Sequence, residues 1–294
     1  MRIAVVDIGT NSVRLLISQV NSGEISPIET GLITTRLGEG IGRKRLLKRS
    51  IKRTVEALFV FRQRIVELGV EKVIVVATSA VRDAANRSEF LAEVKNYLGW
   101  DVRVLSGIEE AALSYQGAVG GLKCDDNNSI VIDIGGGSTE FIWSQNRGLN
   151  FVSLQLGAVR MTENQNGLED IRKLMAETLA EINNQGLTQL IGVGGTMTTL
   201  AAIDQELGKY NPEKVHGYFL TRNRVLDILH RLEQMSLEQR KAVAGLQPQR
   251  ADIIVAGVRI VVAALEGVNT KGVTVSETDI MYGLLYQALG QKIK

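Results

Sequence analysis

One pattern of apolar and polar positions occurs twice in this chain. Residues 5–19 read VVDIGTNSVRLLISQ and residues 131–145 read VIDIGGGSTEFIWSQ, and seven of the fifteen positions are identical. Each copy has an apolar, β-branched run, then Asp-Ile-Gly with small polar residues, then a second apolar run. The pattern predicts a β-hairpin with a glycine-rich turn. Two copies of one hairpin predict two related lobes.

The rest of the chain alternates between strand and helix patterns. Short β-branched runs predict buried strands at 73–77, 102–105, 190–193 and 273–276. Helical spacing predicts helices at 44–67, 88–97, 109–117, 167–184, 197–205 and 280–289, and mostly helix over 221–265. This alternation predicts an α/β fold with mixed sheets. The Gly/Asp/Asn-rich segment 118–128 is the best hinge candidate, which divides the chain into lobes of residues 1–120 and 121–294.

The composition restricts the class of protein and leaves the predicted fold unchanged. A length of 294 residues suits two lobes. Thirty-four basic residues against 32 acidic ones leave a net charge of +2, so overall charge gives no sign of nucleic-acid binding. The single cysteine, Cys124, excludes an internal disulfide. The sequence has no apolar run long enough for a membrane span and no signal-peptide pattern, so we expect a cytoplasmic protein without a membrane partner.

The two glycine-rich turns are the first candidates for chemistry. Backbone N–H groups that converge in such a turn form a nest that binds anions, and nearby hydroxyl groups add donors. Asp7 and Asp133 end the strands that lead into the turns. Because a carboxylate repels phosphate unless a cation intervenes, this combination implies Mg²⁺. The alternative is two hairpin turns with capping aspartates. The candidate phosphate-binding residues are Gly9, Thr10, Asn11 and Ser12 in the first turn, and Gly135, Gly136, Gly137 and Ser138 in the second.

Arg82 and Glu110 are the next candidates. Arg82 follows a predicted strand on a loop of small residues, where a guanidinium can bind two phosphate oxygens; otherwise it is a surface arginine paired with Asp83. Ser106 and Glu109 have the spacing of a capping box. Glu110 then has no structural role, and its carboxylate can polarise an attacking water. The alternative is a pair of solvated acids in the first turn of a helix.

Two further segments leave both a functional and a structural interpretation open. Gly192 to Thr199 form a third glycine turn before a helix, either an anion site or a tightly packed strand-to-helix turn. Residues 43–53 hold seven bases and no acid, either a solvated helix face or a surface for a polyanion. His216 and His230 are too far apart in sequence to indicate a metal site.

Seven motifs together resemble the exopolyphosphatase and guanosine pentaphosphate phosphatase (Ppx/GppA) family, in its short form. They are DIGTNS at 7–12, ATSAVRDAAN at 77–86, SGIEEA at 106–111, DIGGGSTE at 133–140, GVGGTMTTLAAI at 192–203, VHGYFLT at 215–221 and RADIIVAG at 250–257. The resemblance covers nearly the whole chain. It implies the actin-like ATPase (ASKHA) superfamily, with two ribonuclease-H-like lobes, an interlobe cleft, and a last helix, at about 279–292, that packs on the first lobe.

The resemblance also implies roles for individual residues. Glu110 would be the general base toward water, with Glu109 as the alternative in the doublet. Asp133 and Glu140 would hold Mg²⁺, and Asp7 would support the ion. The phosphates would be bound by Arg82 and by the two turns named above.

The function that follows is an exopolyphosphatase, which uses Mg²⁺ and an in-line water to release orthophosphate from inorganic polyphosphate. Guanosine pentaphosphate (pppGpp) is the alternative substrate. A phosphotransferase of the same superfamily and a non-catalytic polyphosphate sensor are less favoured. No specific nucleic-acid partner is expected, and the resemblance implies a homodimer.

Overall fold

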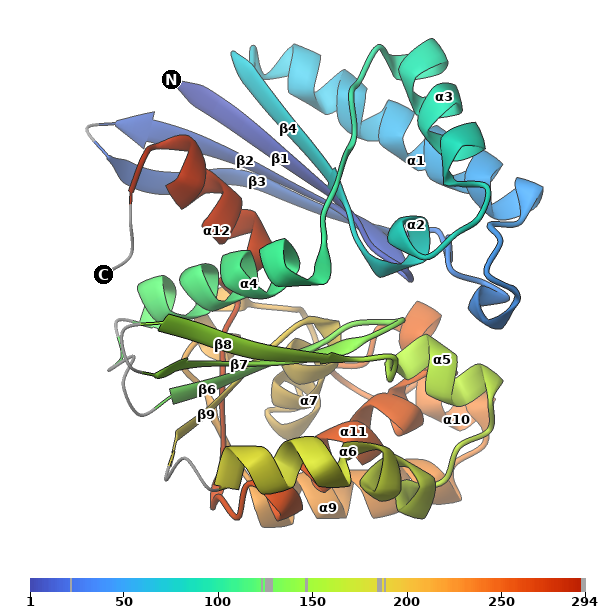
Figure 1. The fold of residues 1–294 in the computed structure, drawn as a ribbon, viewed down its shortest axis with the longest axis vertical. Coiled ribbons are helices and arrows are strands. Elements are labelled where there is room, and N and C mark those ends of the chain that lie inside the picture. The colour runs from blue at the N-terminus through green and yellow to red at the C-terminus, as the bar shows by residue number, and fades with distance from the viewer. Residues whose placement is uncertain are drawn as a thin grey trace. The chain divides into compact units, whose positions relative to one another are not determined.

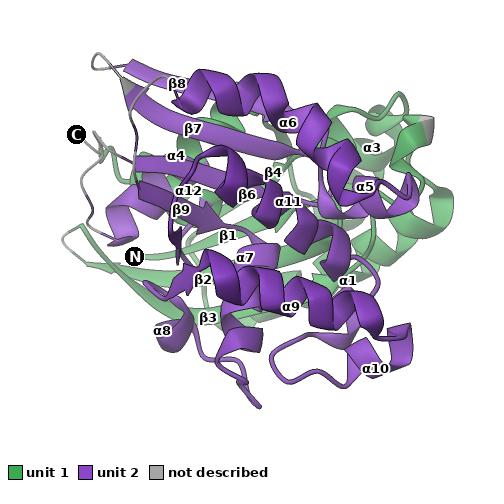
Figure 2. Ribbon diagram, turned by 90° about the horizontal axis from the view of Figure 1, so that it is seen from below, with its two compact units in different colours: residues 1–113, 280–294 green, residues 114–279 purple. Residues whose placement is uncertain are grey.

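The computed structural model describes residues 1–21, 23–122, 124, 129–145, 148–183, 187 and 189–291. They form two compact units, coloured separately in Figure 2. Unit 1 consists of Met1–Leu113 and Ile280–Lys294, and unit 2 of Ser114–Asp279. The chain therefore enters unit 2 inside one helix and returns to unit 1 for its last helix.

Unit 1 is built on a mixed five-stranded sheet in the order β3-β2-β1-β4-β5. Its strands are β1 (Arg2–Ile8), β2 (Ser12–Asn21), β3 (Glu24–Thr34), β4 (Lys72–Ala77) and β5 (Arg103–Val104). β1 pairs antiparallel with β2 and parallel with β4. The predicted first hairpin is confirmed, and β3 extends it to three strands.

Strand β1 lies in the middle of this sheet and is buried on both faces, as its continuous apolar run requires. Ala4, Val6 and Ile8 belong to the core shared with α1 (Lys48–Glu67) and α3 (Arg87–Leu98). The alternate residues Ile3 and Val5 belong to a second core with α12 (Ile280–Ala288). Figure 1 shows α1 and α3 together on one face of the strands and α12 on the other.

The first helix begins one turn later than the apolar spacing predicts. Ile41–Arg43 form a short 3-10 helix, and α1 starts at Lys48. Lys44 adopts the left-handed conformation with φ 51, which interrupts helical geometry. The start at residue 44 was therefore wrong, while the predicted end at residue 67 is confirmed.

Unit 2 repeats the arrangement with six strands in the order β10-β11-β9-β6-β7-β8. The strands are β6 (Ser129–Ile134), β7 (Thr139–Gln145), β8 (Gly148–Leu154), β9 (Gln189–Val193), β10 (Phe219–Thr221) and β11 (Gly272–Val275). β6 pairs antiparallel with β7 and parallel with β9, as β1 does with β2 and β4. The repeat in the sequence is thus a repeat of a whole sheet motif, and the second predicted hairpin is confirmed.

Helix α11 (Ile254–Gly267) is mostly apolar and belongs to the core of unit 2. It packs against α5 (Ala158–Glu163), α6 (Leu168–Asn183), α7 (Gly195–Asp204) and α9 (Arg222–Gln234). Two short helices, α8 (Pro212–Val215) and α10 (Leu237–Lys241), flank α9 in the sequence. The mostly helical segment predicted at 221–265 is confirmed. No helix in the described part of the chain is long and apolar enough to cross a membrane.

The hinge candidate at 118–128 falls partly on helix α4 (Gly107–Leu122), which continues to Leu122. Its positions 123 and 125–128 lie outside the described residues, as does position 184 of the helix expected at 167–184. Gly117 and Gly121 lie within α4 and allow close packing there. A Cβ on Gly117 would lie 1.9 Å from the carbonyl oxygen of Asp279, and one on Gly121 would lie 1.9 Å from Oγ1 of Thr278.

Candidate active site

Both glycine-rich turns close with the same hydrogen bond. The amide of Gly9 donates to the carbonyl of Ser12 at 3.0 Å, and the amide of Gly135 donates to the carbonyl of Ser138 at 3.0 Å. The strand register is also the same, since Asp7 faces Arg14 and Asp133 faces Glu140. The two turns are therefore equivalent in backbone geometry and differ in the side chain opposite the aspartate.

In unit 1, the carbonyls of the turn are engaged by the loop that follows β3. The amides of Thr35 and Arg36 donate to the carbonyl of Asn11 at 3.0 and 2.8 Å, and the amide of Gly38 donates to that of Thr10 at 2.8 Å. A larger residue would not fit at position 38 without a shift, because a Cβ there would lie 2.2 Å from Cγ2 of Thr10. The Oγ1 of Thr10 also shares a hydrogen bond of 2.8 Å with Oγ of Ser79, at the start of α2 (Ser79–Arg82).

In unit 2, the first turn of α5 engages the turn in the same way. The amide of Ala158 donates to the carbonyl of Gly135 at 3.0 Å, and the amides of Val159 and Arg160 donate to that of Gly136 at 2.9 and 3.1 Å. Gly157 allows this approach, because a Cβ there would lie 2.5 Å from the carbonyl carbon of Gly136.

The engaged carbonyls fix where the amides of the turns point. A peptide group is planar and trans, so the N–H of each residue points opposite to the preceding carbonyl. The amides of Asn11 and Ser12 in unit 1, and of Gly136 and Gly137 in unit 2, therefore face away from the segments that hold the carbonyls. Neighbouring amides that point away from these segments are suited to bind an anion. Among the hydroxyl groups, that of Thr139 is used within the fold, because it donates to the carbonyl of Leu156 at 2.6 Å.

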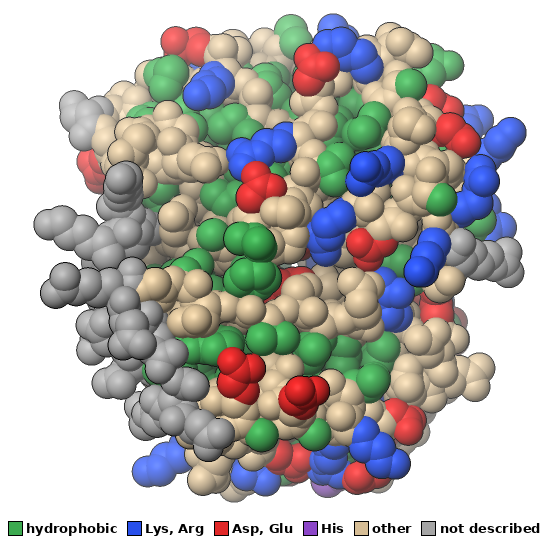
Figure 3. All heavy atoms as spheres, in the orientation of Figure 1, with side chains coloured by type: hydrophobic (Ala, Val, Ile, Leu, Met, Phe, Trp, Pro, Cys, Tyr) green, Lys and Arg blue, Asp and Glu red, His purple; other side chains and the backbone are tan. Residues whose placement is uncertain are grey.

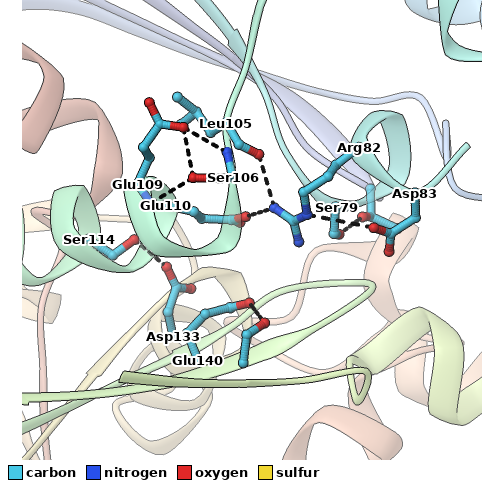
Figure 4. Close-up of polar contacts among 12 residues, drawn as sticks. Ser79, Arg82, Asp83, Leu105, Ser106, Glu109, Glu110, Ser114, Asp133 and Glu140 are labelled. Carbon is cyan, nitrogen blue, oxygen red and sulfur yellow. Dashed lines mark hydrogen bonds and ion pairs between the residues drawn. The ribbon is translucent and has the colours of Figure 1, made fainter. Parts of the chain in front are cut away.

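The two aspartates that precede the turns have different partners. Asp7 is buried and accepts hydrogen bonds from Nε and Nη2 of Arg14 at 2.9 and 2.7 Å. Asp133 accepts a hydrogen bond from Oγ of Ser114 at 2.6 Å, and Glu140 accepts one from Oγ of Ser153 at 2.7 Å (Figure 4). Unit 1 thus pairs its aspartate with a cation, whereas unit 2 sets two carboxylates opposite each other on neighbouring strands.

The carboxylates of unit 2 fit a magnesium ion better than Asp7 does. Mg²⁺ prefers hard oxygen ligands and is commonly held by one or two carboxylates together with waters and phosphate oxygens. Asp133 and Glu140 supply two such carboxylates next to an anion-binding turn, whereas the guanidinium of Arg14 already balances the charge of Asp7. No cluster of three or more metal-ligating side chains occurs within the described ranges, so protein groups alone would not complete the coordination.

Arg82 and Glu110 lie against each other in unit 1. The Nη1 of Arg82 donates to Oε2 of Glu110 at 2.5 Å and to the carbonyl of Leu105 at 3.3 Å (Figure 4). The side chains are 17% and 12% exposed, so the pair is largely shielded from water. Asp83 lies 3.6 Å from Nε of Arg82, so the structural partner considered from the sequence is present.

Glu109 has a structural role instead. Its carboxylate accepts hydrogen bonds from the amide and the hydroxyl of Ser106 at 2.9 and 2.8 Å, and the amide of Glu109 donates to Oγ of Ser106. The predicted capping box is therefore present. A hydrogen bond from Arg103, followed by those from Ser106, lowers the pKa of Glu109 from 4.5 to about 2. The carboxylate of Glu109 is thus used in the helix cap, and Glu110 is the member of the doublet that lies outside the cap.

The third glycine turn joins β9 to α7 and packs against Asp133. Gly194 has φ +91, and a Cβ there would lie 3.0 Å from Oδ1 of Asp133 and 2.8 Å from the carbonyl oxygen of Ile134. A Cβ on Gly195 would lie 2.0 Å from Nη1 of Arg250, so a guanidinium covers the start of α7. The turn is thus a closely packed strand-to-helix connection, and the guanidinium of Arg250 lies against it.

Three of the seven bases in the segment 43–53 pair with acids from elsewhere in unit 1. Glu39 lies 2.6 Å from Arg49 and 3.1 Å from Arg53, and Glu89 lies 3.4 Å from Arg45. On the face drawn in Figure 3, Lys and Arg side chains are interspersed with Asp and Glu. These pairs reduce the self-repulsion of the segment, so its sequence alone is weaker support for a polyanion surface than the base count indicates.

Four residues of the site were missed in the sequence: Arg14, Ser114, Ser153 and Arg160. Arg14 occupies the position of the repeat that is equivalent to Glu140, so the repeat itself contained the signal that Arg14 faces Asp7. Ser114, Ser153 and Arg160 left no comparable signal, because they act through contacts with a turn or with a carboxylate next to it. His216 bridges the carbonyl of Gly121 and the amide of Glu277.

Comparison with known proteins decides the family. The model of the Ppx/GppA phosphatase family matches residues 16–292. This chain belongs to that family. It is 34% identical to exopolyphosphatase 2 of Mycobacterium tuberculosis, over 98% of this chain and 99% of that protein.

Solved structures of other Ppx/GppA proteins share the fold. The family member of Aquifex aeolicus is 31% identical, with a TM-score of 0.79, over 98% of this chain and 97% of that one. An exopolyphosphatase of Cytophaga hutchinsonii is 29% identical, with a TM-score of 0.91, over 99% of both chains. The α/β fold with two mixed sheets is therefore that of the Ppx/GppA family, as the seven motifs implied.

Proposed function

We propose that this protein is an exopolyphosphatase that hydrolyses the terminal phosphoanhydride bond of inorganic polyphosphate and releases orthophosphate. The observation that carries the proposal is the repeated turn whose carbonyls are engaged within each unit, so that its amides point away from the segments that hold the carbonyls. Phosphate chains are rows of anionic oxygens, which such amides bind. The names of the Mycobacterium tuberculosis and Cytophaga hutchinsonii relatives agree with this substrate.

In the proposed reaction, water attacks the terminal phosphorus in line with the bridging oxygen. One P–O bond forms to the water oxygen, the bridging P–O bond breaks, and the shortened chain leaves with the bonding electrons. Glu110 accepts the proton of the water, a role that contributes about 10²–10⁴-fold in rate. Arg82 orients the Glu110 carboxylate through the 2.5 Å contact. The amides of the turns and Arg82 stabilise the equatorial oxygens.

Asp133 and Glu140 are the residues we assign to Mg²⁺. When bound, the ion would neutralise charge on the phosphate oxygens and so stabilise the transition state. Ser114 and Ser153 would orient the two carboxylates through their hydroxyl groups. Asp7 supports the ion less directly in this assignment, because Arg14 already binds its carboxylate.

Guanosine pentaphosphate is a second candidate substrate. The observation that favours it is the family match, because the Ppx/GppA family also includes guanosine pentaphosphate phosphatases.

One experiment separates the candidates. Orthophosphate release is measured from polyphosphate with no nucleotide present, and then with guanosine pentaphosphate as a competitor. We expect release without nucleotide, which a phosphotransferase or a sensor would not give. If release occurs only from guanosine pentaphosphate, the second candidate replaces the first. If neither substrate is hydrolysed, both proposals fail.

A further inference from the structure

Arg160 lies directly against the glycine turn of unit 2. Its Nε donates to the carbonyl of Gly137 at 2.8 Å, while its own amide donates to the carbonyl of Gly136. Its Nη2 donates to Oε1 of Gln155 at 2.7 Å, which orients the guanidinium. One residue therefore engages two consecutive carbonyls of the turn, one with its backbone and one with its side chain.

With the side-chain contact of Arg160, the carbonyls of three successive residues of the turn are held. The carbonyls of Gly135 and Gly136 are held by backbone amides of α5, and the carbonyl of Gly137 is held by Nε of Arg160. Since the peptide group is planar, the bond to Gly137 also sets the direction of the Ser138 amide. With Arg160 in place, three successive amides, those of residues 136, 137 and 138, have their preceding carbonyls fixed.

A glycine-rich turn needs such a restraint because its backbone has little intrinsic preference. Gly136 and Gly137 carry no Cβ, so ψ of Gly137, one of the two torsions that turn the peptide between Gly137 and Ser138, meets little steric resistance. A single hydrogen bond of ordinary strength shifts such an equilibrium by about tenfold. Without the bond to Arg160, the Ser138 amide would point toward the ligand only part of the time.

In unit 1, the carbonyl equivalent to that of Gly137 is the carbonyl of Asn11, which accepts hydrogen bonds from the backbone amides of Thr35 and Arg36. Substitution of a side chain leaves these amides in place. The third carbonyl of the turn in unit 2 is therefore held by a guanidinium, whereas its counterpart in unit 1 is held by backbone amides.

We infer that Arg160 is a positioning residue, which holds the Gly137–Ser138 peptide so that the Ser138 amide binds phosphate. This inference rests on the proposed function and adds a residue to its binding machinery. The required group is the planar Nε–H with its neighbouring Nη2, because these reach the carbonyl of Gly137 and Gln155 together. A lysine keeps the positive charge but lacks this planar fork.

The test compares Arg160→Lys and Arg160→Met with the wild type, and Arg172→Lys serves as the matched control. Arg172 lies on the next helix, α6, and pairs with Glu266 and Glu169 away from the turn. Three quantities are measured: the KM and kcat for polyphosphate, and the dissociation constant for tripolyphosphate by calorimetry. Thermal unfolding shows whether each variant folds.

We expect both Arg160 variants to raise KM and the tripolyphosphate dissociation constant by about tenfold, with a smaller change in kcat. The Arg172 control should match the wild type in all three. If Arg160→Lys binds like the wild type while Arg160→Met does not, charge alone suffices and the positioning role is wrong. If both variants bind like the wild type, the inference is also wrong. If the wild type binds tripolyphosphate but does not hydrolyse polyphosphate, the proposed function fails, and the binding comparison still decides the role of Arg160.

Discussion

Glu110→Gln is the substitution that tests the assigned base most sharply. The change keeps the size of the side chain and an oxygen that can accept the hydrogen bond from Arg82, but it removes the carboxylate that takes the proton. General base catalysis contributes about 10²–10⁴-fold, so we expect kcat to fall by at least about 100-fold. That factor corresponds to about 3 kcal/mol in the activation free energy.

The structure also predicts how stability will respond. The Arg82–Glu110 pair is largely shielded from water, and removing one partner of a buried pair costs about 3–5 kcal/mol. Glu110→Ala leaves Arg82 without this acceptor and should approach that cost, whereas Glu110→Gln retains the acceptor and should cost about 1 kcal/mol. Urea unfolding of the two variants measures the difference.

The assay is orthophosphate release from polyphosphate at saturating Mg²⁺, with Glu109→Gln as the matched control in the neighbouring position. A Glu110→Gln enzyme with kcat within about threefold of the wild type would refute the assignment, since a lost base costs far more. A large loss in Glu109→Gln with little loss in Glu110→Gln would transfer the role to Glu109.

Three further outcomes follow from the same contacts. A hydrogen bond from Arg103 is the largest cause of the lowered pKa of Glu109, about 2, so the stability that this carboxylate gives is present above pH 4.5 and lost as pH falls toward 2. Unfolding curves of the wild type and Glu109→Gln should therefore differ at pH 7 and converge in acid, and a constant difference would contradict this. Asp133→Asn should raise the Mg²⁺ concentration for half-maximal activity at least about tenfold, and an unchanged Mg²⁺ titration would exclude Asp133 as a ligand. Gly194→Ala should reduce activity and destabilise the fold by about 2 kcal/mol, because φ of Gly194 is +91 and a Cβ there would lie 3.0 Å from Oδ1 of Asp133. Gly99→Ala is the control: φ of Gly99 is +73 and the space around it is open, so this variant should lose stability but keep its activity.

The repeat in the sequence predicted more of the fold than any single element did. Identical Asp, Gly and Ser positions in two hairpins require the same register, and the structure has Asp7 facing Arg14 where Asp133 faces Glu140. Backbone periodicity of this kind is local, so the sequence reveals it directly. The start of α1 was wrong because the left-handed conformation of Lys44 depends on the loop around it, and apolar spacing does not report on that.

The sequence predicted the residues of the candidate site better than it predicted the contacts between them. Residue types and spacing pointed to the turns, Arg82 and the Glu109–Glu110 doublet. They did not show that Arg82 and Glu110 contact each other, because 28 positions separate them in the chain. Nor did they show which segments engage the turn carbonyls, since backbone amides carry no sequence signature. That both turns bind one phosphate chain stays a prediction, as do the roles of the individual residues.

The most direct test of the proposed chemistry is hydrolysis of polyphosphate in water enriched in ¹⁸O, with mass analysis of the products. If water attacks the terminal phosphorus, each released orthophosphate carries one ¹⁸O atom and the shortened chain carries none. Label in the new chain end, with unlabelled orthophosphate, would mean attack on the penultimate phosphorus. That result would contradict an active site in which the turns and Glu110 act on the terminal group.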